Sequence, residues 1–299
     1  MSVSEVRSII YNNNEDLAFI IGNGINRYPD EKYLSWENLL IKLRSEITQE
    51  HDFLRPFGIS NTEFFNIIEL ENSSKGKPIK IKDRIVELIR EWTPLIHHKN
   101  IMMAIEELNV PVLTTNFEDI LRKTGNYADK FLSREGFTHY YPWSNYYSIK
   151  DLDNPINGFG IWHINGTIKY PQSIRLGLTD YMGSVHRTRQ WLHRGKSSLF
   201  SGTGHHNWQG SKTWLHIIFN KALFIFGLGL GENETFVRWL LIERKRYFLK
   251  FPNREKKGYY LMIKKDGEDY AGKKYFLESV GIDVIELDDY QDIYERIWQ

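Results

Sequence analysis

Hydrophobic residues along the chain gather in short continuous runs that have the length of a β-strand. Five of these runs end in Gly, Asn or charged residues, at positions 17–21, 110–114, 160–163, 222–226 and 259–263, and a sixth candidate lies at 283–287. Strands that are apolar on both faces are typical of a parallel sheet that is buried on both sides. The runs therefore predict the strands of such a sheet.

Helical spacing of apolar residues separates these runs. Behind Ser35, which we expect to be an N-cap, the apolar positions are Trp36, Leu39, Leu40, Leu43 and Ile47. Similar patterns predict helices at about 62–71, 82–92, 99–108 and 234–250. The alternation of strands and helices predicts an α/β fold with a Rossmann-like, mostly parallel sheet and helices on both faces.

We interpret residues 1–299 as a single domain. Its Rossmann core would cover about 15–35 and 105–290, and an inserted helical module would cover about 36–104. Two stretches, 126–157 and 180–210, show no clear periodicity. Loops of this length in a compact domain are usually functional or mobile, so we expect one of them to cover a site.

The first candidate site follows the first predicted strand, in the segment FIIGNGINRYPD. Gly22 and Gly24 would let backbone N–H groups approach a phosphate closely, because glycine has no Cβ and tolerates positive φ. Gly-x-Gly after a strand is also compatible with an ordinary structural turn. Both interpretations stay open at this point.

Polar residues end the second predicted strand, in VPVLTTNFEDIL. Open α/β sheets bind their ligands at the carboxyl ends of strands, where Thr114, Thr115 and Asn116 would stand. An Asn side chain carries both a donor and an acceptor, and it can hold a sugar hydroxyl or an attacking water. The alternative is that Asn116 caps a helix at 117–123.

A histidine ends the third predicted strand, in FGIWHINGTIKY. His163 can take a proton from a hydroxyl near neutral pH, which makes it the natural general base in a chain without cysteine. A structural histidine is the alternative. The other histidines, including His97, His98, His205 and His206, lack the spacing of a metal site, and we assign no metal.

A second glycine-rich loop follows the fourth predicted strand, in ALFIFGLGLGENETFVRWLL. Gly227, Gly229 and Gly231 lead into a predicted helix, which is close to the dinucleotide-binding fingerprint, although the third glycine comes one residue early. At the end of the next predicted strand, where a ribose-binding acid is expected, the chain has Lys264 and Lys265.

Composition narrows the classes of function. The chain has 39 Lys and Arg, 38 Asp and Glu, and no cysteine. The net charge of +1 argues against a broad electrostatic grip on nucleic acid or on an anionic membrane. The lack of cysteine excludes disulfides, Cys-ligated zinc and a thiol nucleophile. No apolar run reaches the roughly 18 to 20 residues of a membrane helix and the first residues lack a signal-peptide pattern, so we expect a cytoplasmic protein.

The order and spacing of FIIGNGIN, TTNFE, WHINGT and FGLGLG resemble the sirtuin (silent information regulator) family. The segment 211–248 is similar to the sirtuin-like domains of bacterial anti-phage defence proteins, and the resemblance spans about 17–287. It implies that Asn116 holds the ribose or the attacking water and that His163 is the general base. It also implies a set of residues that bind NAD⁺: Gly22, Asn23, Gly24, Asn26, Asp30, Thr115, Glu118, Gly227, Gly229 and Glu234.

The sequence departs from the family pattern in its glycine loops and polar segment, and its lack of cysteine selects a branch of the family. Asn23 stands where the family usually has alanine, Glu118 where it has aspartate, and Leu228-Gly229 where it has Thr-Ser. Deacylases of the family carry a zinc ribbon held by four cysteines, which this chain cannot build. The resemblance therefore implies the branch that cleaves NAD⁺ itself: an NAD⁺ glycohydrolase, or NADase, that releases nicotinamide and ADP-ribose and depletes NAD⁺ in anti-phage defence.

Two other classes of function stay open. Asn23 and the altered second glycine loop also suit a module that senses NAD⁺ or ADP-ribose and regulates a partner without turnover. The basic runs at 187–196 and 244–250 suggest a nucleic-acid-acting effector, although no acidic metal cluster is evident. The resemblance implies a homo-oligomer or control by a partner such as a HerA-type ATPase or an Argonaute-like protein.

Overall fold

The computed structural model describes residues 1–12, 16–29, 33–202, 204–231, 234–265 and 267–299. An eight-stranded sheet lies at its centre. Its strands are β1 (Leu17–Ile21), β2 (Val112–Thr114), β3 (Ala128–Phe131), β4 (Asn145–Ser148), β5 (Ile161–His163), β6 (Ala222–Phe226), β7 (Gly258–Ile263) and β8 (Asp283–Leu287).

The sheet has the strand order β3-β4-β5-β2-β1-β6-β7-β8. All neighbouring pairs from β5 to β8 are parallel, whereas β3 and β4 extend the sheet in antiparallel fashion. Numbered along the chain, the parallel strands lie in the doubly wound order 3-2-1-4-5-6. The predicted α/β class with a mostly parallel, Rossmann-like sheet is confirmed.

The helices of the described residues alternate with these strands. They are α1 (Val3–Asn12), α2 (Gly24–Arg27), α3 (Trp36–Thr48), α4 (Asn61–Ser73), α5 (Ile81–Ile89), α6 (Ile96–Leu108), α7 (Leu178–His193), α8 (Leu215–Asn220), α9 (Thr235–Lys250), α10 (Glu268–Ser279) and α11 (Tyr290–Tyr294). No helix in this part of the chain is both long enough and apolar enough to cross a membrane.

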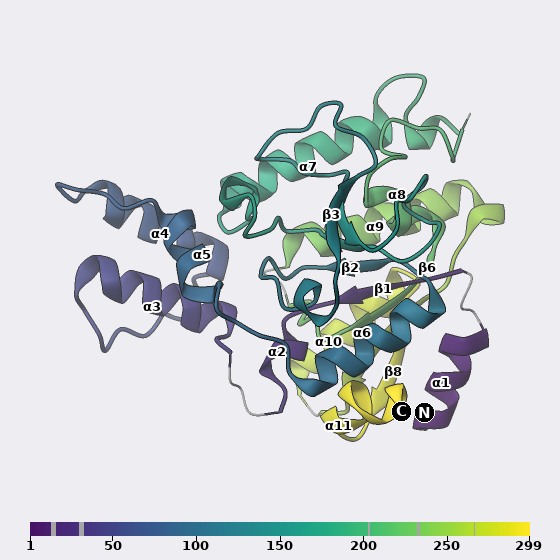
Figure 1. Cartoon of the computed structure of the whole chain (residues 1–299), viewed down its shortest axis with the longest axis horizontal. Helices are drawn as coiled ribbons and strands as arrows, with labels where there is room; N and C mark the ends of the chain where they lie inside the picture. Colours follow the sequence, from purple (N-terminus) through teal and green to yellow (C-terminus); the bar gives the residue numbers. More distant parts are fainter. Residues whose placement is uncertain (13–15, 30–32, 203, 232–233, 266) are drawn as a thin grey trace.

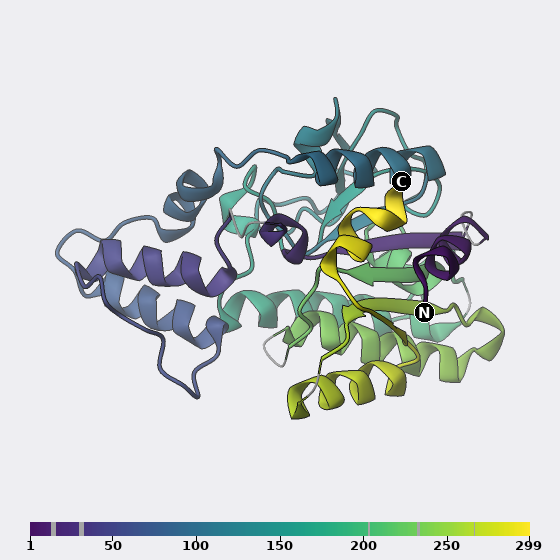
Figure 2. The same cartoon turned by 90° about the horizontal axis from the view of Figure 1, so that it is seen from below.

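Helices cover both faces of the sheet, and the side chains of β1 show how. Ala18 and Ile20 belong to an apolar cluster with α8 and α9, whereas Leu17, Phe19 and Ile21 belong to a cluster with α1, α6 and α11. Alternate residues of a strand point to opposite faces, so a strand buried on both sides must be apolar throughout. Figure 2 shows α6 and α9 on opposite sides of the strands.

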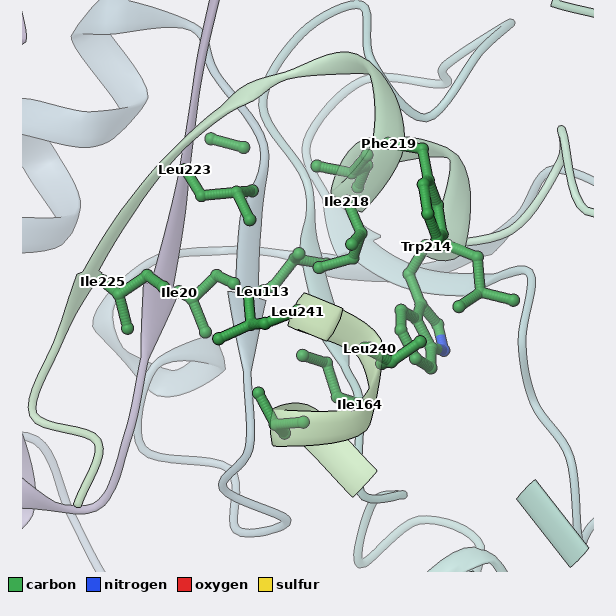
Figure 3. Close-up of a cluster of buried hydrophobic side chains, with 14 of the residues drawn as sticks. Ile20, Leu113, Ile164, Trp214, Ile218, Phe219, Leu223, Ile225, Leu240 and Leu241 are labelled. Atoms are coloured by element: carbon green, nitrogen blue, oxygen red, sulfur yellow. The ribbon is translucent and has the colours of Figure 1, made fainter. Parts of the chain in front are cut away.

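The first of these clusters is drawn in Figure 3. Side chains of neighbouring strands meet the apolar sides of α8 and α9 there, and the labelled residues are Ile20, Leu113, Ile164, Trp214, Ile218, Phe219, Leu223, Ile225, Leu240 and Leu241. Trp214 is almost fully buried among them. This packing fixes the sheet from which the loops of the site extend.

Helices α3, α4 and α5 lie together at one end of the molecule, away from the parallel strands (Figures 1 and 2). We call them the helical lobe. Their facing apolar residues form a cluster of their own that also takes in Ile174 and Leu176. By contrast, α6 packs on the sheet through Ile101, Met102 and Ile105. The interpretation of 36–104 as one inserted module stays a prediction.

Ser35 is the N-cap of α3, as predicted, because its side chain accepts a hydrogen bond from the N–H of Asn38 at 3.1 Å. The stretches without clear periodicity contain regular structure that we did not predict: β3 and β4 lie within 126–157, and α7 covers much of 180–210. The strands ADKF and NYYS mix polar and apolar residues, so no apolar run marks them.

Candidate functional site

A cavity of about 900 Å³ lies at the carboxyl ends of the parallel strands. The neighbouring strands β1 and β6 end there, at the point where the chain connections turn to opposite sides of the sheet. Open α/β sheets bind their ligands at such switch points. Residues of the helical lobe, including Trp36 and Asn61, form the opposite wall.

The cavity brings together most of the residues predicted for the site. Those that line it are Asn23, Gly24, Thr115, Asn116, Glu118, Gly227, Gly229 and Glu234. Gly22 and Asn26 do not line it but lie next to residues that do, and His163 lines a smaller neighbouring cavity. Asp30 lies outside the described residues.

The two glycine loops are in direct contact. The N–H of Gly22 donates to the carbonyl of Phe226 at 3.0 Å, and the N–H of Gly24 donates to that of Gly227 at 2.6 Å. A Cβ at Gly22 would lie 2.5 Å from Cα of Leu228, and one at Gly24 would lie 2.8 Å from the Gly227 oxygen. These glycines are therefore required for packing between the loops.

A buried chain of hydrogen bonds holds the polar residues behind the first glycine loop. The N–H of Leu95 donates to Nδ1 of His98 at 3.0 Å, and Nε2 of His98 donates to Oδ1 of Asn26 at 3.1 Å. Nδ2 of Asn26 then donates to Oε1 of Glu118 at 2.9 Å and to Oδ1 of Asn23 at 2.8 Å. Each donor in this chain fixes the orientation of the next group.

Burial sets the charges in this network. It lowers the pKa of His98 to about 3, with a further contribution from neighbouring His97, so His98 is neutral at physiological pH. Burial also raises the pKa of Glu118, although the bonds that its carboxylate accepts from Asn26 and from the N–H of Ile120 oppose that shift. Glu118 thus presents a desolvated carboxyl group at the cavity.

Asn116 and His163 are joined through the backbone. Nδ1 of His163 donates to the carbonyl oxygen of Asn116 at 2.7 Å, because a carbonyl can only accept. Burial lowers the pKa of His163, so the ring is neutral and Nε2 carries a free lone pair. Among the described residues, Nε2 of His163 and Nδ2 of Asn116 are buried without a hydrogen-bond partner of normal geometry. Nε2 of His163 is therefore available to a bound molecule, whereas the Asn116 amide also interacts with the carboxyl group of Glu118.

Asn116 is not a helix cap. The alternative prediction of a helix at 117–123 is wrong, because only a short 3₁₀ turn, Arg122–Thr124, forms in that stretch. The N–H of Ile168, in the segment after β5, donates to the carbonyl of Phe117 at 2.8 Å, so this carbonyl is used outside the stretch. The Asn116 side chain is thus not used to start a helix.

His163 lines a separate cavity of about 10 Å³, which is about the size of one water molecule. Trp143 and Trp214 also line this space, and Arg175 lines both this cavity and the large one. His163 therefore lies beside the large cavity and not in its wall. The residues 141–143, from one of the unassigned stretches, cover the small cavity, and Tyr181 from the other stretch lines the large one.

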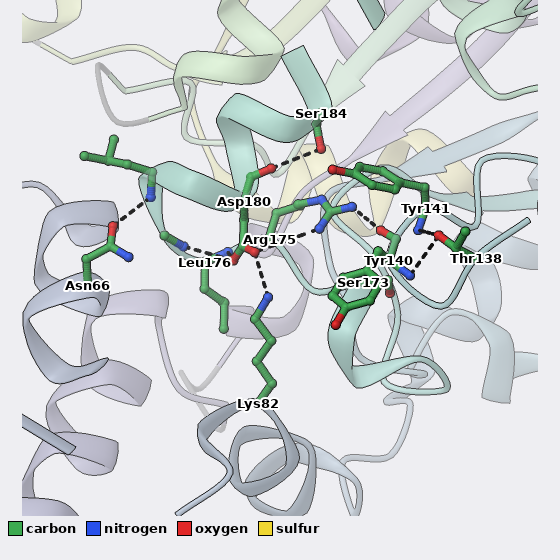
Figure 4. A network of polar contacts seen from close by, with 12 residues as sticks. Asn66, Lys82, Thr138, Tyr140, Tyr141, Ser173, Arg175, Leu176, Asp180 and Ser184 are labelled. Carbon is green, nitrogen blue, oxygen red and sulfur yellow. Dashed lines mark hydrogen bonds and ion pairs between the residues drawn. The ribbon is translucent and has the colours of Figure 1, made fainter. Parts of the chain in front are cut away.

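Arg175 is a site residue that the sequence analysis missed. Its guanidinium donates to the carbonyl of Tyr140, lies 4.7 Å from the centre of the Tyr141 ring and is 4.0 Å from Asp180 (Figure 4). Burial lowers its pKa. In the sequence it stands within SIRLGL between the buried Ile174 and Leu176, where nothing distinguishes it from a surface arginine.

Asp180 links the wall of the cavity to the helical lobe. Its carboxylate forms an ion pair with Lys82 of α5 at 2.8 Å and accepts from the N–H groups of Leu176 and Gly177 (Figure 4). Asn66 of α4 accepts from the N–H of Leu178 at 2.9 Å. These contacts hold the start of α7 against α4 and α5.

Comparisons with known proteins do not identify the chain. No protein-family model matches it, and no curated protein matches it. Within the described ranges, no group of three or more His, Asp or Glu side chains is placed to hold a metal ion.

Replacing Gly22 should disrupt the contact between the glycine loops. The Gly22→Ala variant puts a Cβ against the backbone of Leu228, and overpacking of this kind costs about 1–3 kcal/mol of the free energy of unfolding. Gly229→Ala is the matched control, because a Cβ there meets no atom within 4 Å. Urea unfolding of both variants measures the difference, and equal stabilities would contradict the role of Gly22.

His98 should make folding sensitive to acid. Unfolded His98 binds a proton below its ordinary pKa of 6.5, whereas the folded protein resists protonation down to about pH 3. The stabilising contribution of neutral His98 is thus complete above pH 6.5 and falls as the pH decreases, by up to about 1.4 kcal/mol per pH unit. His98→Gln should make the dependence of the free energy of unfolding on pH shallower by that amount between pH 4.5 and 6. His51→Gln, at an exposed position, should leave it unchanged.

Proposed function

We propose that the chain is an NAD⁺ glycohydrolase that binds the dinucleotide in the 900 Å³ cavity and releases nicotinamide and ADP-ribose. The observation that carries the proposal is the pair formed by Asn116 and His163. The 2.7 Å bond from Nδ1 of His163 to the Asn116 carbonyl leaves Nε2 as an unprotonated, unpartnered base. A role in anti-phage defence rests on the resemblance of the sequence motifs alone.

The shape and position of the cavity support a dinucleotide as the substrate. Its volume is within the range of about 300–1,000 Å³ that small-molecule sites have. It lies at the switch point of the sheet, where β1 and β6 end in glycine loops that touch. Aromatic residues of the wall, among them Trp36, Tyr260 and Tyr290, offer flat apolar surfaces to the rings of a nucleotide.

The reaction breaks the bond between C1′ of the ribose and the nicotinamide nitrogen. The leaving group is cationic in NAD⁺, so it departs with the bonding electron pair as neutral nicotinamide, and positive charge develops on the ribose. The Glu118 carboxyl group at the cavity would stabilise that charge in its ionised form, which the hydrogen bonds from Asn26 and Ile120 favour. Water then adds to C1′ and loses one proton, so that NAD⁺ and water give nicotinamide, ADP-ribose and a proton.

Asn116 and His163 would act on the water. The Asn116 amide would orient it, and Nε2 of His163 would accept its proton. The small cavity beside His163 has room for about one water molecule, and Arg175 lines both this cavity and the large one. The mechanism therefore requires the two spaces to join when the substrate binds.

A second candidate is a module that binds NAD⁺ or ADP-ribose without turnover. The observation that favours it is the position of His163 outside the wall of the large cavity. Tight binding of NAD⁺ by calorimetry, with no loss of NAD⁺ over hours by NMR, would support this candidate against hydrolysis.

One observation behind the nucleic-acid alternative, the basic run of α9, is weaker in the structure than in the sequence. Arg244 is buried, and its guanidinium donates to the carbonyls of Ile218, Lys221 and Lys256. Arg246 on the same helix pairs with Glu243 at 2.6 Å. The basic run of α9 is therefore partly engaged within the protein.

Removing either reacting side chain should stop hydrolysis. His163→Ala and Asn116→Ala should each reduce the rate of nicotinamide release by about 100- to 10,000-fold, the usual loss for a positioned general base. Chromatography of nicotinamide measures the rate, and circular dichroism checks that each variant is folded. Because the pKa of His163 is lowered, the rate of the parent protein should not fall until the pH is below 6.5.

The matched control is His186→Ala, at an exposed position on α7, which should keep the parent rate. Full activity of both His163→Ala and Asn116→Ala would refute the roles assigned to these residues. No nicotinamide from the parent protein, with or without a partner, would refute the enzyme itself.

A further inference from the structure

The large cavity has a basic end that the proposed reaction does not use. It lies where β7 ends, next to the second glycine loop, because β6 and β7 are parallel neighbours in the sheet. In dinucleotide-binding units of strand, glycine loop, helix and strand, an acid at the end of the second strand binds the 2′-hydroxyl of the adenosine ribose, and a cation there accommodates a 2′-phosphate. In this chain β6, the glycine loop, α9 and β7 form that unit, and Lys264 and Lys265 follow β7.

Two lysines line this end of the cavity from different elements. Lys265 is in the segment that follows β7, and Lys273 comes from α10. Burial, followed by the positive charges of Lys265 and Arg238, lowers the pKa of Lys273, whereas Asp269 opposes the shift. Both lysines line the same cavity, and the charge of Lys265 makes a positive charge on Lys273 less favourable.

Carboxylates compensate these charges only in part. Asp269 lines the same end of the cavity, but no ion pair of Lys273 is found within the described ranges. The carboxylate of Glu286 is already engaged, since it pairs with Lys274 at 3.2 Å and accepts from the hydroxyl of Tyr270. The Lys274 side chain therefore pairs with Glu286, whereas the side chain of neighbouring Lys273 lines the cavity.

We propose that Lys265 and Lys273 bind a phosphate monoester on the adenosine ribose, so that the site prefers the 2′-phosphorylated dinucleotide NADP⁺ to NAD⁺. A phosphate monoester carries a charge of about −1.5 to −2 at pH 7, which two clustered lysines would neutralise. The inference rests on the proposed function for the location of the dinucleotide. It does not require turnover, because it concerns binding alone.

Calorimetry with two reaction products tests the proposal separately from catalysis. The parent protein should bind 2′-phosphorylated ADP-ribose about 10- to 100-fold more tightly than ADP-ribose, the factor expected for hydrogen bonds to a charged group. Lys273→Ala and Lys265→Ala should each lose much of this preference while they bind ADP-ribose as before. Lys274→Ala is the matched control, and it should keep the preference because Lys274 pairs with Glu286.

Three results would overturn the proposal: equal affinity of the parent protein for the two ligands, no binding of either, or variants that weaken both ligands by the same factor. The last result would mean that the lysines bind the diphosphate. Conversely, preferential binding of the 2′-phosphorylated ligand without release of nicotinamide from NADP⁺ would refute the proposed enzyme and leave the inference standing.

Discussion

The contact between the two glycine loops is the constraint on which the rest of the site depends. Gly22 and Gly24 lie so close to Gly227 and Leu228 that no side chain fits between the loops. Their N–H groups bond to carbonyls at the end of β6 and in its loop. This contact joins the ends of two parallel strands at the switch point, and it fixes where α2 starts.

The buried histidines show how hydrogen bonding separates a structural role from a chemical one. His98 uses both ring nitrogens, one as an acceptor from Leu95 and the other as a donor to Asn26. His163 uses only Nδ1, which donates to Asn116 and leaves Nε2 without a partner among the described residues. Both rings are kept neutral by burial, so the difference between them lies in the free lone pair.

The sequence predicted the parallel part of the sheet well, because strands buried on both faces are apolar throughout. The resemblance of the motifs implied that Asn23, Thr115 and Gly227 belong to one site, and all three line the cavity. The polar strands β3 and β4 and the helix α7 could not be recognised by the same signal.

The sequence alone could not predict the environments of individual side chains. Arg175 belongs to no sequence motif. It lines both cavities, and it contacts Tyr140, which is distant along the chain, and Asp180, which follows a few residues later. His163 likewise lines a small cavity with Trp143 and Trp214, residues that no motif of the sequence connects to it. The sequence places Lys265 directly after a predicted strand. Lys273 lines the same cavity because of how α10 packs, which the sequence did not predict.

The central claim is that the cavity at the carboxyl ends of the parallel strands, beside the two glycine loops, binds the ADP-ribose part of a dinucleotide. Amide hydrogen exchange with and without saturating ADP-ribose tests it most directly. Exchange should slow together in three separate segments, 22–26, 114–118 and 227–231, because all three border the cavity. No change in these segments, or protection confined to the helical lobe, would contradict the account.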